Sequence, residues 1–209
     1  LHELQVLEKI IPPMAHARGL VQFNEYHKFT VDEHSIRAVE FATDLVKDTT
    51  TLGATYRSIK DKRLLHLALL LHDLGKGHAG DHSDVGKELA GQTARHLGLR
   101  QSESDTVSYL VAKHLIMSHL AQRRDIHDTN VVVPFSVDVG SLETLEMLYV
   151  LTCADLAAVG PGVLNDWKQD LLTQLYLHAR EYLAGDGVGA AMDERLAGRR
   201  TEIQTRIRN

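Results

Sequence analysis

The segment from Lys62 to Leu74 limits the possible folds of this chain more than any other part of the sequence. It reads KRLLHLALLLHDL and is apolar on nearly every side of a helix, which predicts a central helix surrounded by other helices. Two polar residues, His72 and Asp73, stand side by side where this helix is expected to end. Unpaired polar groups are costly away from water, and a bound metal ion would offset that cost. We therefore expect a metal site at this end of the central helix.

Helical periodicity dominates the rest of the chain as well, and strand alternation is nearly absent. The sequence predicts an all-α fold, a helical bundle with the metal site in its core. A capping-box pattern from Thr30 to Glu33 predicts the start of a helix, and Gly75 is expected to cap the central helix in a left-handed conformation. Further helices are expected over residues 83–98, 102–115, 141–159 and 163–183. Only Val131 to Phe135 is a plausible strand or buried loop.

Composition and charge exclude several classes of protein. Hydrophobic residues make up 44% and charged residues 24% of the 209 residues, as is typical of one soluble globular domain. The formal net charge of −5 argues against a general affinity for nucleic acid or anionic membranes, because both partners demand a cationic surface. The single Cys153 cannot form an intrachain disulfide, and no apolar stretch is long enough to span a bilayer. We therefore expect a cytoplasmic protein.

Four residues are candidate ligands for one metal ion. His72 and Asp73 end the central helix, His34 falls on the apolar stripe of the helix that begins after Thr30, and Asp155 falls on the apolar stripe of the helix expected over residues 141–159. Imidazole and carboxylate ligands suit manganese, iron, zinc or magnesium, and the set lacks the thiolates of a closed structural zinc site. Open coordination positions would remain for water and substrate, and the pKa of such a water falls to roughly 7 in favourable cases.

The order His34, His72-Asp73, Asp155 resembles that of the HD superfamily of metal-dependent phosphohydrolases. The segments LVQFNEYHKFTVDEHSIRAVE, LLHDLGKGHAGDHSDVG, VAKHLIMSHLAQRRDI and LTCADLAAVGPGVLNDWKQDLLTQLYLHARE resemble, more narrowly, the HD domain of the bacterial bifunctional uridylyltransferase/uridylyl-removing family. The resemblance extends from near Leu1 to about Leu183. We expect an N-terminal helix and connecting segment over residues 1–30, an HD phosphohydrolase domain over 31–184, and a linker with a basic tail over 185–209. The family's nucleotidyltransferase and ACT domains are not represented, so an excised central domain is expected.

This resemblance also implies an activity, namely hydrolysis of the uridylyl-tyrosine phosphodiester on the PII signal protein with release of UMP. The expected cofactor is a divalent metal, Mn²⁺ or Mg²⁺ first and iron or zinc second, as one or two ions. In two-metal relatives extra histidines bind the second ion, and here His82 and His114 are the candidates. Lys76, one turn past the dyad, is a candidate to neutralise charge on the phosphoryl oxygens.

Other residues are candidates for the remaining chemistry. His114 is also a candidate catalytic residue through contact with the substrate. His119 is a candidate for proton transfer, although the tyrosine leaving group, with a pKa near 10, needs little help. Arg123 and Arg124 are candidates to contact phosphate, uridine or the partner's loop.

Simpler interpretations stay open beside these. Asp155 could pair with Arg37 or Thr152, His82 could be a solvated loop histidine, Arg123 and Arg124 could be an ordinary solvated pair, and Trp167 is most simply a core residue. Two other functions also stay open. One is a phosphohydrolase that acts on a small nucleotide, and the other is a regulatory domain that contains a metal but catalyses nothing.

Overall fold

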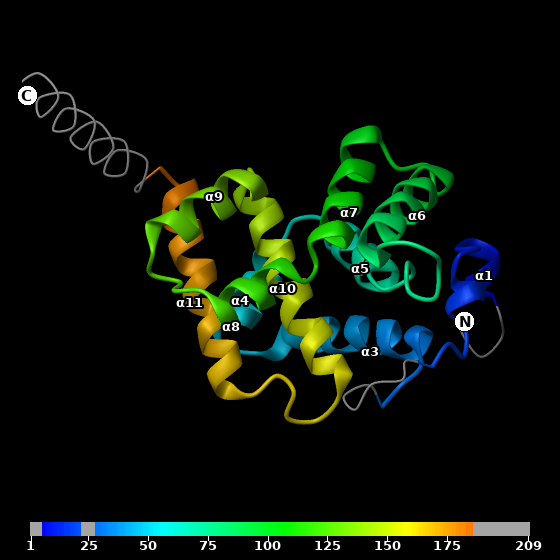
Figure 1. Cartoon of the computed structure of the whole chain (residues 1–209), viewed down its shortest axis with the longest axis horizontal. Coiled ribbons are helices and arrows are strands. Elements are labelled where there is room, and N and C mark those ends of the chain that lie inside the picture. The colour runs from blue at the N-terminus through cyan, green and yellow to red at the C-terminus, as the bar shows by residue number, and fades with distance from the viewer. Residues whose placement is uncertain (1–5, 22–27, 186–209) are drawn as a thin grey trace, which may run out of the picture.

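The computed structural model describes residues 6–21 and 28–185 (Figure 1). In it the segment from Lys62 to Leu74 lies at the centre of the helices, as predicted. Within those two ranges the secondary structure is helical and contains no strand, so the predicted all-α fold is confirmed. The helices are α1 (Leu7–Ile10), α2 (Met14–Ala17), α3 (Val31–Asp44), the 3-10 helix η1 (Leu45–Lys47), α4 (Thr51–Ser58), α5 (Lys62–Leu71), α6 (His82–His96), α7 (Gln101–Lys113), α8 (Ile116–Arg123), α9 (Thr129–Val139), α10 (Leu142–Val159) and α11 (Asp166–Leu183). Part of the predicted first helix and the basic tail lie outside the described residues.

Helix α5 has buried residues on several sides, as its composition requires. Leu65, Ala68, Leu69 and Leu71 have no exposed surface, and α3 and α7 pack against the helix. Helix α10 is enclosed in the same way, since every residue from Met147 to Asp155 is buried. Two helices that are apolar all round therefore form the centre, and amphipathic helices cover them.

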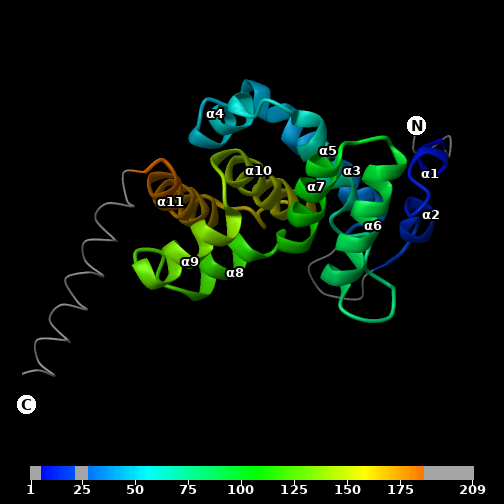
Figure 2. The same cartoon turned by 90° about the horizontal axis from the view of Figure 1, so that it is seen from above.

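Helix α10 crosses the middle of the molecule and divides the other helices into two groups (Figures 1 and 2). Helices α3, α5, α6 and α7 lie on one side, where α6 packs along α7 and α3 packs against α5 and α10. Helices α8, α9 and α11 lie on the other side, where α11 contacts both α8 and α9. The end of α5 and the first turn of α3 both approach α10 from the first side, and this arrangement positions the candidate ligands.

The prediction of a strand or buried loop over Val131 to Phe135 is wrong, because this segment lies inside α9. The run of β-branched valines favours a strand locally. Tertiary packing overrides that preference: Val132, Phe135 and Val139 are buried at helical spacing, and α9 packs against α11. The side chain of Asp128 caps the helix by accepting a hydrogen bond from the Asn130 N–H.

The end of the central helix also differs from the prediction. Helix α5 ends at Leu71, and Gly75 does not adopt the left-handed conformation, which Gly77 and Gly80 adopt instead. Gly75 is required for another reason, because a Cβ atom there would collide with the backbone carbonyl of His82. The turn after α5 thus lies directly against the start of α6.

Three predicted helix starts were only partly right. Helix α3 begins after Thr30 as expected, but the Thr30 side chain makes no capping hydrogen bond. Helix α6 is capped by Asp81, and at the start of α7 Glu103 accepts from the backbone N–H of Arg100.

The prediction that Trp167 lies in the core is wrong, since 62% of its surface is exposed. None of the helices in the described ranges combines the length and apolar character needed to cross a membrane.

Candidate metal centre

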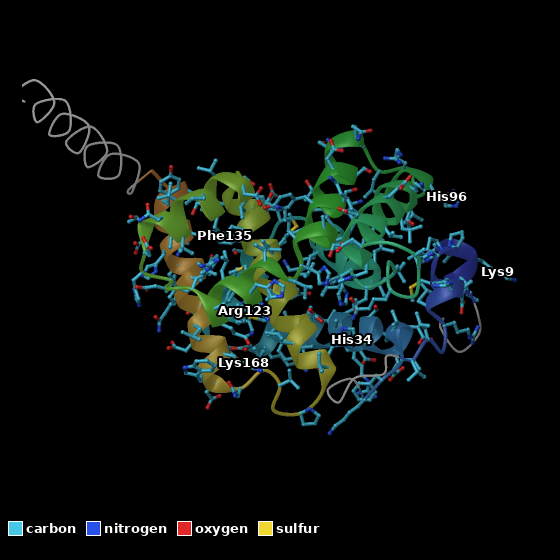
Figure 3. The ribbon with its side chains drawn as sticks, viewed as in Figure 1. Lys9, His34, His96, Arg123, Phe135 and Lys168 are labelled. Carbon is cyan, nitrogen blue, oxygen red and sulfur yellow. The ribbon has the colours of Figure 1, made fainter. Side chains whose placement is uncertain are left out.

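Three helices bring the four candidate ligands of the central site together. Helix α3 carries His34, the end of α5 carries His72 and Asp73, and the buried middle of α10 carries Asp155. Figure 3 shows His34 on α3 facing the interior next to α10. The exposed fractions are 1% for His34, 0% for His72, 2% for Asp73 and 9% for Asp155, so the cluster is almost sealed and opens on the side of Asp155.

The ligand atoms of this cluster lie close enough to share one ion. His34 Nε2 is 3.1 Å from His72 Nε2 and 2.9 Å from Asp155 Oδ1, and His72 Nε2 is 3.4 Å from that oxygen. Two ligand atoms about 2.1 Å from one metal ion and at right angles to each other are about 3 Å apart. Asp73 Oδ2 lies slightly farther off, at 3.6 Å from His34 Nε2 and 3.5 Å from His72 Nε2. The spacing of His34, His72 and Asp155 fits a common ion, and Asp73 stays the predicted fourth ligand beside them.

Backbone contacts set the protonation of two of the histidines. His72 Nδ1 lies 2.7 Å from the carbonyl oxygen of Leu69, which can only accept, so Nδ1 carries the proton and donates it. In the neutral ring, the form that binds a metal ion, the lone pair of His72 is then on Nε2, the atom that faces the other ligands. His114 makes the same contact with the carbonyl of Val111 at 2.7 Å, and its Nε2 is likewise available as a ligand.

The cluster is electrostatically suited to a cation. Burial lowers the pKa of His72, but the carboxylates of Asp73 and Asp155 outweigh burial and raise that pKa to about 9. Burial raises the pKa of Asp155, but the rings of His72 and His34 hold it well below its usual range. Two buried carboxylates thus require positive charge beside them. Since the nitrogen and oxygen ligands converge on one point, a divalent ion fits these residues.

Lys76 adds a fixed positive charge at one edge of the cluster. Its Nζ lies 2.6 Å from Asp73 Oδ2, and its side chain is 18% exposed. The turn after α5 produces this contact, because it places Lys76, three residues after Asp73, on the same side of the chain as Asp73. The ammonium group therefore lies between the buried cluster and the surface.

His114 and His82 lie beyond Asp73, on the other side from His34. His114 Nε2 is 3.8 Å from Asp73 Oδ1, while Asp73 Oδ2 faces the first group of ligands. The ring centroids of His114 and His82 are 6.2 Å apart, and His82 is partly exposed at the start of α6. Burial, followed by the charge of His72, lowers the pKa of His114 and favours the neutral ring that a ligand requires. Asp73 thus has one oxygen toward each group.

Three other predicted site residues are not part of this cluster. His119 and Arg123 are exposed on α8, and Arg124 is exposed just after it. No contact between described residues joins these side chains to the candidate ligands. Arg37, the rival partner considered for Asp155, instead pairs with Glu33 through an Nε to Oε1 contact of 2.8 Å.

The structure adds one residue for which the sequence indicated no such role. Thr152 lies one turn before Asp155 on α10, and its hydroxyl donates to the carbonyl of Leu148 at 2.8 Å and to that of His114 at 3.3 Å. The second bond ties α10 to the end of α7. Sequence periodicity placed Thr152 on the inward face but carried no signal of this contact.

A helical bundle that directs two imidazoles and one carboxylate onto one point, with a second carboxylate beside them, defines a metal-binding α-helical domain. Residues 31–148, more than half of the chain, match the HD domain family, and the chain belongs to that family. It is similar to enzymes named bifunctional uridylyltransferase/uridylyl-removing enzyme. The identity is 39% to that of Rhodospirillum rubrum over 97% of this chain, 38% to that of Erythrobacter litoralis over 98%, and 37% to that of Zymomonas mobilis subsp. mobilis over 97%. These alignments cover 22%, 23% and 23% of the relatives, so the chain spans less than a quarter of their length.

Proposed function

We propose that this chain is a metal-dependent phosphodiester hydrolase, the uridylyl-removing domain of a bifunctional uridylyltransferase/uridylyl-removing enzyme. The convergence of His34, His72 and Asp155 within 2.9–3.4 Å of one another carries this proposal. The names of the relatives support the uridylyl-removing reaction. The proposed substrate is the uridylylated PII protein, the product is UMP, and the longer protein would add nucleotidyltransferase and ACT domains and act in the cytoplasm.

The proposed ligands of the first ion are His34, His72, Asp73 and Asp155, with Mn²⁺ or Mg²⁺ as the preferred ion. A bound divalent ion supplies Lewis-acid polarisation of a phosphoryl oxygen and a lowered pKa of water. The position of Asp73, with Oδ1 turned toward His114, supports a second site that His114 and His82 would complete.

The protein side chains have separate proposed tasks in this reaction. Lys76 orients Asp73 through their 2.6 Å contact and stabilises negative charge on the phosphoryl group at the edge of the cluster. The buried walls around His72 exclude bulk water and strengthen these interactions. The departing tyrosine has a pKa near 10 and leaves with little assistance from an acid. The roles of His119 and Arg123 stay predictions.

Metal analysis combined with an activity assay tests the proposal. We expect the wild-type chain to bind a divalent ion and to release UMP from uridylylated PII, and we expect His72→Ala to lose both properties. His96→Ala is the matched control, because His96 is an exposed histidine of α6 far in sequence from the dyad. Undiminished UMP release by the ion-free His72→Ala protein would contradict the proposal.

The assay also separates the two rival functions. Hydrolysis of free nucleotides without release of UMP from uridylylated PII would replace the proposed substrate by a small nucleotide. Ion binding without turnover of either substrate, in a protein that carries all the domains of the relatives, would identify a regulatory domain instead.

A further inference from the structure

A pocket lies between α8 and α9, and none of the candidate metal ligands lines it. We call it the α8–α9 pocket. It is lined by Ile116, Leu120, Arg124, Asn130, Val131, Pro134, Phe135 and Asp138, and its volume is about 430 Å³. The residues from α8 and the following turn recur at a spacing of four, so they form one face of that helix. Figure 3 labels Phe135 on the α9 side and Arg123 on α8.

The pocket has an apolar floor and one uncompensated charge. Asp138 Oδ2 is already bonded, since Lys113 Nζ lies 3.0 Å from it and the hydroxyl of Tyr109 lies 3.1 Å from it. The guanidinium of Arg124 makes no hydrogen bond or ion pair with any residue in the described ranges. The charge presented to a ligand is therefore positive, and it lies at the Arg124 end.

The start of α9 adds no net positive charge to the pocket. Its first turn begins at Thr129, and a helix N-terminus carries partial positive charge. The carboxylate of Asp128 offsets that charge, because it accepts from the Asn130 N–H at 2.8 Å. The positive character of the pocket therefore depends on Arg124.

We propose that the α8–α9 pocket is an accessory binding site for a small organic anion with a flat apolar body. The apolar side chains of Leu120, Val131 and Phe135 would contact the body, and Arg124 would bind its anionic group. The volume lies within the range of about 300–1,000 Å³ that is usual for small-molecule sites. This assigns Arg124 to a site separate from the metal centre, and it does not depend on the proposed hydrolase activity.

Binding of naphthalene-1-sulfonate, measured by calorimetry and by amide chemical shifts of the chain, tests the proposal. We expect saturable binding with shifts clustered on α8 and α9. Arg124→Gln should weaken binding by about tenfold or more, because a charge-assisted hydrogen bond is lost. Val131→Phe, which fills the pocket, should also weaken it. The neutral analogue 1-naphthol should bind less tightly to the wild type and be insensitive to Arg124→Gln.

Arg123→Gln is the matched control, because it removes the same charge from the neighbouring exposed position and Arg123 does not line the pocket. It should leave the affinity for the sulfonate unchanged. Equal weakening by both arginine variants, shifts centred on His34 and His72, or no binding of the sulfonate would each overturn the proposal. Thermal unfolding of each variant verifies that the comparison is between folded proteins.

Discussion

Asp73 divides its two carboxylate oxygens between different partners. Its Oδ2 contacts Lys76 Nζ at 2.6 Å and lies 3.5 Å from His72 Nε2, and its Oδ1 lies 3.8 Å from His114 Nε2. Lys76 therefore competes with an ion for the same oxygen while also holding the carboxylate in place. We therefore expect Lys76 to affect the rate of UMP release more than the binding of the ion.

Lys76→Met tests this separation. We expect release of UMP from uridylylated PII to fall by about a hundredfold, because one preorganised positive group is removed from the site. The ion content should be retained, since the nitrogen ligands of His34 and His72 are unchanged. Lys87→Met, a charge change on the exposed side of α6, is the control. Loss of the ion together with the activity would show instead that Lys76 is needed to assemble the ligands.

For single residues, the sequence predicted which side chains could reach the candidate metal centre but not which hydrogen bonds connect them. His34 and Asp155 lie on apolar stripes, so periodicity alone indicated that they point inward. The bond from Thr152 to the carbonyl of His114 depends on how the end of α7 meets α10, which no local pattern encodes. Trp167 was misjudged because an aromatic residue at helical spacing is usually buried, whereas here it lies on the first turn of α11 and is exposed.

At the level of helices, the start positions show which capping rules the folded chain uses. Ser141 caps α10 by accepting from the Thr144 N–H at 3.1 Å, at the expected start of this helix. A helix was also expected to start at residue 102, but α7 begins earlier, and the Glu103 side chain accepts from the Arg100 N–H at 2.8 Å. A serine at an expected helix start thus caps one of these two helices and not the other.

Two serine substitutions measure this difference. Ser141→Ala should lower the free energy of unfolding by about 1 kcal/mol, the usual cost of losing a capping side chain. Ser102→Ala should have little effect, since this exposed serine does not cap α7. Urea unfolding followed by circular dichroism gives both values. A loss at Ser102 as large as that at Ser141 would contradict the assigned start of α7.

The lowered pKa of Asp61, at the start of the central helix, makes the stability of the folded chain depend on pH. Asp61 caps α5, and hydrogen bonds from the Arg63 side chain, against a smaller effect of burial, hold its pKa below the usual range. A lowered pKa in the folded state contributes stability above the unfolded pKa of about 3.9, and that contribution is lost as the pH falls through the folded value. Asp61→Asn should therefore lower the melting temperature at pH 7, and the difference from wild type should shrink toward pH 3. A difference that does not change with pH would contradict the assignment.

Helix α9 marks the limit of what local sequence indicates about an element. Three consecutive valines and an internal proline disfavour a helix, yet α9 is helical from Thr129 to Val139. The deciding interactions come from α11, which is far along the chain. Helix α3, whose apolar residues recur with a clear period, could be predicted because local and tertiary preferences agree there.

For the whole molecule, the proposed ion joins helices from both ends of the domain. Removal of the ion with a chelator should therefore lower the melting temperature of the entire chain, by the equivalent of about 2.7 kcal/mol if the free ion had been a hundred times its dissociation constant. His34→Ala should melt at a temperature that no longer depends on added ion. A melting temperature of the wild type that is insensitive to chelator and to added Mn²⁺ would argue against ion binding in the core.

His34 and Asp155 are 121 residues apart in the chain, and their contact at 2.9 Å closes the centre of the fold. During synthesis α3 leaves the ribosome long before α10, so a nascent chain would expose the apolar sides of α3 and α5 until α10 emerges. A protein that stops short of α10 would lack both the packing partner of α3 and one of the acidic side chains of the cluster. Assembly of the centre is thereby delayed until nearly all of the domain has been translated.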